Sequence, residues 1–168
     1  GAYKLLANEV GGRKTTAPER VAEEMAELLS WYEGMSDGLS SRTFRDLLDF
    51  HVRFERIHPF QDGNGRTGRY LLALYLNHDL TMPTVLSLSR TIAENKNAYY
   101  KAFMEAEDKL NCGELTLFVN TILGFIRKAQ DELIDELEVR VDQLDKGRAV
   151  CDQLERKHGL SAKAVSIL

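Results

Sequence analysis

The segment from residue 58 to residue 69, HPFQDGNGRTGR, constrains the fold of this chain more than any other. Apolar residues recur at helical spacing before it, and an apolar run from Tyr70 to Leu76 follows it, so the segment is predicted to be a loop that opens into a helix. Such a helix start presents unpaired N–H groups and the positive end of its dipole, and glycines let an anion approach the main chain. Arg66 and Arg69 are unfavourable in a first helical turn, which indicates an external anion such as phosphate that compensates them.

Other phosphate and metal motifs fit this segment less well. Its G-x-G-x-x-G pattern, which starts at Gly63, lacks the preceding strand and the later acid of a dinucleotide-binding unit. A Walker loop requires Lys and then Ser or Thr where Arg69 and Tyr70 stand, and a calcium loop requires Glu where Ala73 stands. Asn64-Gly65 is also a hairpin-turn signal, but the helical flanks argue against a plain turn.

The order His-Pro-Phe-x-Asp-Gly-Asn-Gly-Arg-x-x-Arg resembles the active-site signature of the Fic family, and every position of that signature is filled. A weaker resemblance covers about residues 1–145. Residues 1–4 with Gly11-Gly12 resemble the flap hairpin of the family, and residues 50–57 resemble the helix that leads into the loop. The resemblance implies an all-α, Fic-type helical bundle with a small β-hairpin flap near the N-terminus. It also implies transfer of a nucleoside monophosphate, usually AMP from ATP, to a Ser, Thr or Tyr hydroxyl of a target protein.

The residue types themselves suit such chemistry. An imidazole with an ordinary pKa near about 6.5 is well placed to accept the proton of an attacking hydroxyl, so His58 is the candidate general base. Pro59 disfavours helical angles in the preceding residue, which places His58 at a helix end. Asp62 offers one hard oxygen ligand, and Mg²⁺ typically binds one or two carboxylates together with substrate phosphates.

Phosphate contacts are expected from the rest of the loop. Gly63, Asn64 and Gly65 would supply main-chain N–H donors and one side-chain amide to the α- and β-phosphates. Arg66 and Arg69 would bind the outer phosphates, and the family resemblance assigns the γ-phosphate to Arg69. For both arginines the alternative is pairing within the chain, with Asp62, Glu55 or another acid.

Two further side chains near the loop are expected to be structural. Phe60 is expected to pack in the core and so to anchor the loop. His51 has no nearby partner set for a metal, so it is interpreted as a hydrogen-bonded histidine of the core or of the loop support.

Helical patterns dominate the rest of the chain. A capping box at Thr16–Glu19 opens a helix whose apolar stripe reaches Tyr32, and residues 34–41 are interpreted as a loop. Further helices are predicted at 43–57, from the motif to about His78, at 89–110 and at 114–145, with a connector at Met82-Pro83 and a stop at Gly147. Only residues 3–15 look like strand.

The predicted hairpin at about residues 3–15 lies before the first helix. By the resemblance it docks an extended target segment through main-chain hydrogen bonds. The residues assigned to docking are Asn8, Glu9, Val10, Gly11 and Gly12. Without the resemblance, the pattern supports only a hairpin around Gly11-Gly12, and Asn8-Glu9 fits an irregular loop equally well.

Two domains are expected: a Fic catalytic domain over residues 1–146 and a helical extension over residues 147–168. Residues 158–161 of the extension resemble the opening of a helix-turn-helix or winged-helix unit, which would be incomplete at Leu168. Seven acids stand against one arginine between Asp131 and Asp145, so binding of DNA by this fragment is not expected. Apolar residues of the same segment could cover a partner, and a homodimer is one option, although packing on the chain's own core is more ordinary.

Composition and cysteine usage limit the class of protein and its expected cellular location. The 168 residues are 43% hydrophobic, enough for one substantial core, and they include no long apolar span or signal-peptide pattern, so a soluble protein without membrane segments is expected. Cys112 and Cys151 fit no metal or redox spacing, which suits reduced thiols and a cytoplasmic location. The absence of an initiator Met suggests a processed form or a fragment.

The leading functional hypothesis is an AMP transferase that uses ATP and Mg²⁺. The alternatives are a related enzyme that uses another nucleotide or removes AMP, and a nucleotide-sensing regulatory module with a helix-turn-helix extension. An intact His58 favours chemistry over sensing. Many family members are inhibited by a helix of pattern Ser/Thr-x-x-x-Glu-Gly/Asn, but the nearest string, residues 15–20, ends in Arg and contains Pro18. The inhibitory element is therefore expected upstream of Gly1 or on another chain.

Overall fold

The structure is a computed structural model that describes residues 2–34 and 41–158. Its contacts divide the chain into two compact units, residues 1–129 and residues 130–168. The first unit contains the site and is built almost entirely of helices. The second unit consists, in its described part, of the continuation of one long helix.

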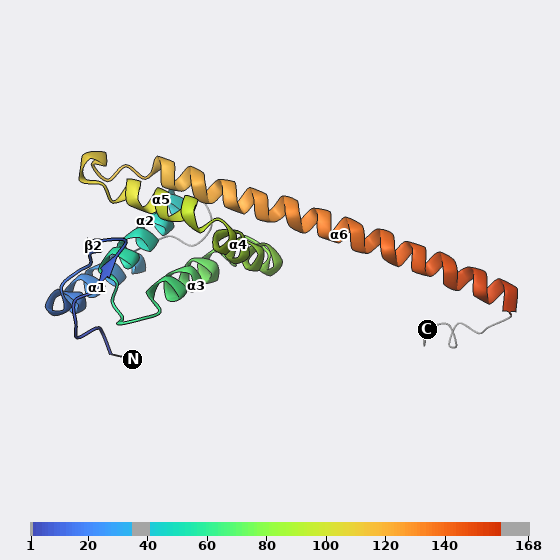
Figure 1. Ribbon diagram of the computed structural model, residues 1–168, viewed down its shortest axis with the longest axis horizontal. Coiled ribbons are helices and arrows are strands. Elements are labelled where there is room, and N and C mark those ends of the chain that lie inside the picture. Colours follow the sequence, from blue (N-terminus) through green and yellow to red (C-terminus); the bar gives the residue numbers. More distant parts are fainter. Residues whose placement is uncertain (1, 35–40, 159–168) are drawn as a thin grey trace. The chain divides into compact units, whose positions relative to one another are not determined.

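A two-stranded antiparallel hairpin precedes the helices (Figure 1). Strand β1 (Glu9–Val10) pairs with β2 (Arg13–Lys14), with Glu9 opposite Lys14. The helices are α1 (Pro18–Glu33), α2 (Ser41–Ile57), α3 (Asn64–Leu76), α4 (Met82–Glu94), α5 (Lys96–Ala106) and α6 (Thr116–His158), with a 3₁₀ turn at Lys109–Asn111. The expected helical fold with a small N-terminal hairpin is confirmed.

Helix α2 lies at the centre of the first unit because it is apolar on two faces. One face buries Phe50, Phe54 and Ile57 against α1. The other face packs against α3, α4, α5 and the first turns of α6, in a cluster that includes Phe44, Leu47, Leu48, Val52, Leu72, Leu76, Leu88, Tyr99, Phe103, Phe118 and Ile122. A helix with apolar residues on two faces is stable only when both faces are covered, which is what places α2 between the other helices.

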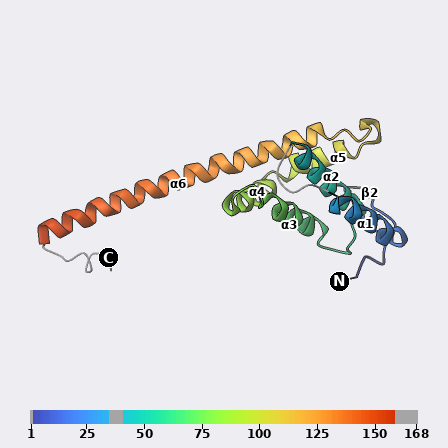
Figure 2. The same cartoon turned by 180° about the vertical axis from the view of Figure 1, so that it is seen from behind.

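The first turns of α6 run beside α5 in both ribbon views (Figures 1 and 2). Phe118 of α6 contacts Phe103 of α5 edge to face, with their ring centroids 4.8 Å apart. Such aromatic pairs add to the free energy gained by burial of the rings. This contact fixes α5, which forms one wall of the site described below.

Two predicted element boundaries are wrong. The single helix expected at 89–110 is divided into α4 and α5 at Asn95, whose backbone leaves the helical region with φ −110° and ψ 35°. Its side-chain amide donates a hydrogen bond of 2.7 Å to the Thr91 carbonyl, which satisfies one acceptor at the end of α4. Met82-Pro83 is not a connector but the first turn of α4. A proline is tolerated there because the N–H groups of a first helical turn have no partner within the helix.

The helix stop predicted at Gly147 is also wrong, because α6 continues to His158. A glycine inside a helix costs only about 1 kcal/mol relative to Ala, so its neighbours can carry the helix through. Lys146 forms a 2.6 Å ion pair with Asp142 one turn earlier. The expected helix-turn-helix opening and most of the loop predicted at 34–41 lie outside the described residues, and the domain boundary at 146/147 stays a prediction.

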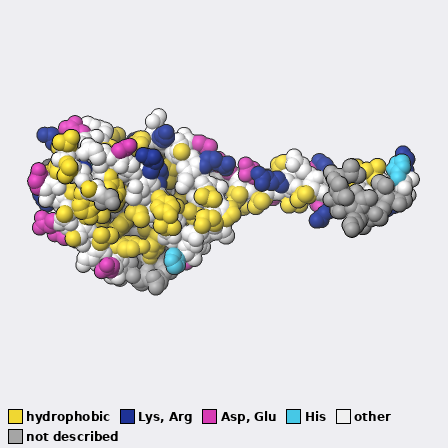
Figure 3. All heavy atoms as spheres, turned by 90° about the horizontal axis from the view of Figure 1, so that it is seen from below, with side chains coloured by type: hydrophobic (Ala, Val, Ile, Leu, Met, Phe, Trp, Pro, Cys, Tyr) yellow, Lys and Arg dark blue, Asp and Glu magenta, His cyan; other side chains and the backbone are white. Residues whose placement is uncertain are grey.

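Hydrophobic side chains also remain exposed on the first unit. Examples are Tyr70 and Leu74 of α3 and Leu86 of α4. Figure 3 shows hydrophobic side chains gathered on one face of that unit. Within the described ranges, no helix combines the length and the apolarity needed to span a membrane.

Replacing Leu48 with Ala should lower the free energy of unfolding of the first unit by about 2–5 kcal/mol, because the fully buried side chain would leave a cavity in the centre of α2. Urea-induced unfolding followed by circular dichroism measures the change. Leu86→Ala is the matched control, since that side chain is 64% exposed and its loss should change stability by less than about 0.5 kcal/mol. Equal effects of the two substitutions would contradict the central position of α2.

Candidate active site

His58 lies directly after the last residue of α2. Its main-chain N–H still donates a 2.9 Å hydrogen bond to the Phe54 carbonyl, but its φ of 52° takes the chain out of the helix in the left-handed region. This conformation is uncommon for a residue other than glycine and marks a local constraint. Pro59 disfavours the right-handed helical conformation at His58, and the structure places the imidazole at the helix end that the sequence predicts.

The loop after His58 is closed by the side chain of Asn64. The Phe60 N–H donates to Asn64 Oδ1 at 2.8 Å, and Asn64 Nδ2 donates to the Phe60 carbonyl at 2.7 Å. Asn64 is 1% exposed, and the Phe60 ring packs against Phe54 with the apolar residues between α1 and α2. Phe60 therefore anchors the loop as expected, and the Asn64 amide that was expected to contact phosphate is used inside the loop.

Helix α3 starts from Gly63, whose φ of 85° suits glycine. The Gly63 N–H donates a 2.6 Å hydrogen bond to Asp62 Oδ1, and Asp62 Oδ2 lies 3.6 Å from Arg66 Nη2. The side chains of Asp62 and Arg66 are both mostly exposed, and an exposed pair of this kind contributes little stability. Both groups are therefore available to a charged ligand at small cost.

A metal ion could be held here only together with a ligand. Among the residues that the structure describes, no group of three His, Cys, Asp or Glu side chains could hold a metal. Asp62 by itself offers a solvent-facing carboxylate beside the start of α3. This donor set fits Mg²⁺ that shares one carboxylate with substrate phosphates, and it does not fit a metal held by protein ligands alone.

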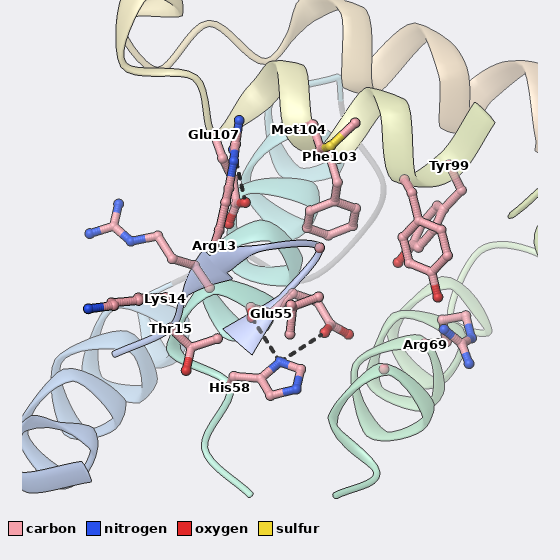
Figure 4. A pocket seen from close by; sticks show the side chains of 15 residues that line it. Arg13, Lys14, Thr15, Glu55, His58, Arg69, Tyr99, Phe103, Met104 and Glu107 are labelled. Carbon is pink, nitrogen blue, oxygen red and sulfur yellow. Dashed lines mark hydrogen bonds and ion pairs between the residues drawn. The ribbon is translucent and has the colours of Figure 1, made fainter. Parts of the chain in front are cut away.

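A cavity of about 540 Å³ lies beside His58 (Figure 4). His58, Gly65 and Arg69 line it on one side, and α5 forms an aromatic wall with Tyr99, Tyr100 and Phe103. The hairpin contributes Val10, Gly11, Arg13, Lys14 and Thr15. The structure thus brings His58, Gly65 and Arg69 together with Val10 and Gly11 of the flap. The other predicted site residues, Asn8, Glu9, Gly12, Asp62, Gly63, Asn64 and Arg66, do not line this cavity.

Arg69 is held at the cavity by its neighbours. Its guanidinium donates a hydrogen bond to the Tyr99 hydroxyl. A Cβ atom on Gly65 would lie 3.2 Å from Arg69 Nη1, so the glycine leaves room for the guanidinium beside the start of α3. Glycine at this position therefore serves the placement of the arginine as well as access to the main chain.

The imidazole of His58 is oriented by Glu55, one turn earlier in α2. His58 Nδ1 lies 3.2 Å from the main-chain oxygen of Glu55 and 3.8 Å from its carboxylate Oε2. A carbonyl oxygen only accepts, so Nδ1 carries the proton and Nε2 is free to accept another. Burial lowers the pKa of His58 below its usual value of 6.5, the hydrogen bond to the Glu55 carbonyl opposes this, and the charge of Lys4 lowers it further. The imidazole is thus neutral and able to act as a base at neutral pH.

Lys4 is a structural residue of the site that the sequence did not reveal. It is 2% exposed, and its ammonium donates to Asn8 Oδ1 at 2.9 Å, to Thr15 Oγ1 at 2.6 Å and to the Ile57 carbonyl at 3.1 Å. These bonds fasten the base of the hairpin to the end of α2. Burial lowers the pKa of Lys4, and the charge of Glu24 opposes the shift. No local pattern marks a single lysine near a chain start for this role.

Glu55 is a second residue that sequence reasoning missed as a part of the site. Its side chain is 15% exposed, and its Oε1 is buried with no hydrogen-bond partner in the described part of the chain. Burial raises the pKa of Glu55 to about 7, while Arg69 lowers it and Glu107 raises it further. Its position three residues before His58 on a helix was the available signal, because residues at that spacing lie on one helix face.

His51 is a hydrogen-bonded core histidine, as the sequence indicated. It is 1% exposed, and its Nε2 lies 2.7 Å from the Tyr99 hydroxyl. Burial lowers the pKa of His51 to about 4, so the ring is neutral. The contact joins α2 to the aromatic wall on α5.

The hairpin is tied to the far side of the cavity by an ion pair. Arg13 Nη1 lies 3.4 Å from the Glu107 carboxylate, which follows α5, and the dashed line in Figure 4 marks this contact. Both side chains are partly exposed, so the pair adds little stability. It nevertheless holds the hairpin across the cavity from the α5 side.

Comparison with known proteins identifies relatives of this chain. Residues 1–76 match the Fic/DOC family. The protein adenylyltransferase fic-1 of Caenorhabditis briggsae is 32% identical over 122 residues, which is 73% of this chain and 22% of that protein. The protein of the same name from Caenorhabditis elegans is 30% identical over 144 residues, which is 86% of this chain and 26% of that protein. The chain therefore spans about a quarter of the length of these two relatives.

A solved structure supports the same relationship. The crystal structure of a Fic family protein from Desulfovibrio desulfuricans G20 resembles this chain with a TM-score of 0.64 and 28% sequence identity. The match covers 80% of this chain and 41% of that protein.

Gly68→Ala should destabilise the protein by about 1–3 kcal/mol, because a Cβ there would lie 2.3 Å from Glu55 Oε1 and 3.2 Å from His51 Cε1. Gly124→Ala is the matched control, since it lies in α6 with nothing within 4 Å of its Cβ position, and Ala should stabilise that helix by about 0.5–1 kcal/mol. Chemical denaturation of both variants checks the difference in sign. Stabilisation by both substitutions would show that α2 and α3 are not closely packed at Gly68.

Proposed function

Because the chain carries a Fic/DOC-family domain, we propose that it is a protein adenylyltransferase that moves AMP from ATP to a Ser, Thr or Tyr hydroxyl of a target protein. One observation carries the proposal: a neutral His58 with Nε2 free, Arg69 and the glycine-rich start of α3 lie together at one cavity. The cavity of about 540 Å³ is in the size range of small-molecule sites, and its aromatic wall suits a nucleobase.

The proposed reaction is a displacement at the α-phosphorus. The oxygen of the target hydroxyl forms a bond to the α-phosphorus, and its proton passes to His58 Nε2. The bond between the α-phosphorus and the bridging oxygen breaks, and pyrophosphate leaves. His58 has the two properties that this step needs, since its pKa lies below 6.5 and its Nδ1–H is already engaged.

The phosphates would lie against the start of α3. Main-chain N–H groups of Asn64 and Gly65 are proposed as donors to the phosphate oxygens, since a helix start leaves such groups without helical partners. The Gly63 N–H would join them by exchanging its hydrogen bond to Asp62 Oδ1 for one to phosphate. Arg66 and Arg69 would bind the outer phosphates, with Arg69 on the γ-phosphate. Asp62 would hold Mg²⁺ together with phosphate oxygens, and bound Mg²⁺ would neutralise charge on the pyrophosphate.

The target is proposed to dock along the hairpin. Both residues of β1, Glu9 and Val10, are exposed, and Val10 and Gly11 also line the cavity. An exposed strand edge next to a site can bind an extended peptide through main-chain hydrogen bonds, with little demand on its sequence. This arrangement would bring an acceptor hydroxyl toward His58.

His58→Ala should reduce transfer of label from α-labelled ATP to protein by about 10²–10⁴-fold, because the proton acceptor is lost. Intact-mass analysis of self-labelling, and labelling of a panel of candidate proteins, measure the transfer. His78→Ala is the control, since His78 is exposed and does not line the cavity.

Other outcomes of the same assay would overturn the proposal. Label retained only from γ-labelled ATP would indicate a kinase-like reaction, and release of AMP from a modified protein would indicate the reverse direction. Binding of ATP without transfer to any protein would favour a sensing module.

Arg69→Ala should raise the KM for ATP by roughly 10-fold or more, because a charge-assisted contact to phosphate is lost. Steady-state kinetics over a range of ATP concentrations measures the change. Arg20→Ala is the control, since this exposed arginine of α1 pairs with Glu24 away from the cavity. An unchanged KM in Arg69→Ala would exclude the phosphate role of this residue.

A further inference from the structure

The buried carboxylate of Glu55, which lacks a full set of hydrogen-bond partners in the described chain, lies between His58 and Arg69 (Figure 4). Glu55 projects from α2 into the cavity wall, with His58 on one side and Arg69 on α3 beyond it (Figure 4). Its Oε1 is buried and has no hydrogen-bond partner among the residues that the structure describes. A buried acid in this state destabilises a fold, so its presence at a site points to a functional role.

The carboxylate is confined by the packing of α3 on α2. A Cβ on Gly68 would lie 2.3 Å from Glu55 Oε1 and 3.2 Å from its carboxyl carbon. The carboxylate therefore occupies the space that a side chain at position 68 would fill. This confinement keeps Oε2 on the side of His58.

Glu55 presents two acceptors to one nitrogen of His58. The main-chain oxygen lies 3.2 Å from Nδ1, and the carboxylate Oε2 lies 3.8 Å from the same atom. The carbonyl fixes the proton on Nδ1 and leaves Nε2 free. The carboxylate is too far for a short hydrogen bond but close enough to interact with a charge on the ring.

We propose that Glu55 is the positioning residue of His58: its main-chain oxygen selects the Nδ1–H tautomer, and its carboxylate stabilises the imidazolium that forms when Nε2 takes the hydroxyl proton. The inference rests on the proposed function for the source of that proton. An acid that orients an imidazole and stabilises its cation is a known arrangement in enzymes that use a histidine base. Here the acid comes from the same helix face, one turn before the base.

The charge state of Glu55 depends on groups from several elements. The groups that act on Glu55 or His58 are Arg69 of α3, Glu107 after α5, Lys4 of the N-terminal segment and Tyr99 of α5. Burial is the largest influence and raises the pKa of Glu55 to about 7, while the pKa of His58 lies below 6.5. A rate that needs only neutral His58 would hold down to below pH 6.5, whereas a rate that also needs the Glu55 charge falls as the pH drops through about 7.

Glu55→Gln tests the proposal, because it removes the charge but keeps the size of the side chain and the main-chain carbonyl. We expect kcat for AMP transfer to fall about 10–100-fold with little change in the KM for ATP, as for other residues that orient a reactive group. The acid limb of the pH–rate profile should move from about 7 to below 6.5. Glu55→Asp retains the charge and should recover part of the rate and keep the limb nearer to that of the wild type.

Glu105→Gln is the matched control. It also removes one carboxylate, but Glu105 lies on α5 outside the cavity lining, where it pairs with Lys101 at 3.9 Å. Its kcat and its pH profile should equal those of the wild type. A loss of rate in Glu55→Gln with an unmoved acid limb would assign Glu55 a packing role and overturn the inference.

Nitrogen-15 NMR of His58 in the nucleotide-free protein gives a readout that does not depend on activity. In the wild type, Nδ1 should carry the proton, and the His58 nitrogen shifts should change as the Glu55 carboxylate titrates near pH 7. In Glu55→Gln this step should be absent, because position 55 then carries no titrating group. Thermal melting shows whether each variant is folded, and Glu55→Ala, which also removes the carboxylate, replaces Glu55→Gln in the titration should the latter unfold. Identical His58 titrations in wild type and variant would overturn the inference. A shifted titration in a protein that transfers no AMP would instead leave the Glu55–His58 coupling in place and reject the proposed function.

Discussion

The close packing of α2 on α3 is the constraint on which the rest of the site depends. At Gly68 the two helices approach so closely that a single Cβ would collide with the Glu55 carboxylate. This approach brings the end of one helix, with His58, next to the start of the other, with Gly65 and Arg69. The imidazole at one helix end and the glycine and arginine at the other helix start are thereby placed on one cavity by the packing of a single helix pair.

The loop between the two helices is held by internal hydrogen bonds and not by a ligand. Both polar atoms of the Asn64 amide bond to the main chain of Phe60, and the Phe60 ring is anchored beside Phe54. On the other side, Lys4 fastens the hairpin to the Ile57 carbonyl. The loop is therefore organised by the chain itself, which would reduce the ordering that binding of the proposed nucleotide must impose.

Local pattern was sufficient to predict much of the fold. The apolar periodicity of residues 43–57 and of the run after Tyr70 predicted α2 and α3, and glycines predicted the hairpin, because these signals depend on neighbours along the chain. The boundaries at Asn95 and Gly147 were missed for the opposite reason. The helix propensity of Asn95 is too weak a signal to predict a break, and the break there is set by how α4 and α5 pack on the core. The destabilisation of a helix by Gly147 is too small to end the helix by itself.

What the sequence by itself determined is the chemistry of residues 58–69, because a base, a carboxylate, glycines and arginines in one short segment must lie close together in any fold. Only the tertiary structure decided how these groups are tuned and which of them share a cavity. Lys4 acts on His58 through its charge, and Glu55 acts on it through a main-chain hydrogen bond. Tyr99 accepts a hydrogen bond from Arg69, and both Lys4 and Tyr99 lie far from the motif in the chain. Burial and the approach of distant groups are properties of packing, which is why the proton affinity of His58 could not be derived from its own sequence neighbourhood.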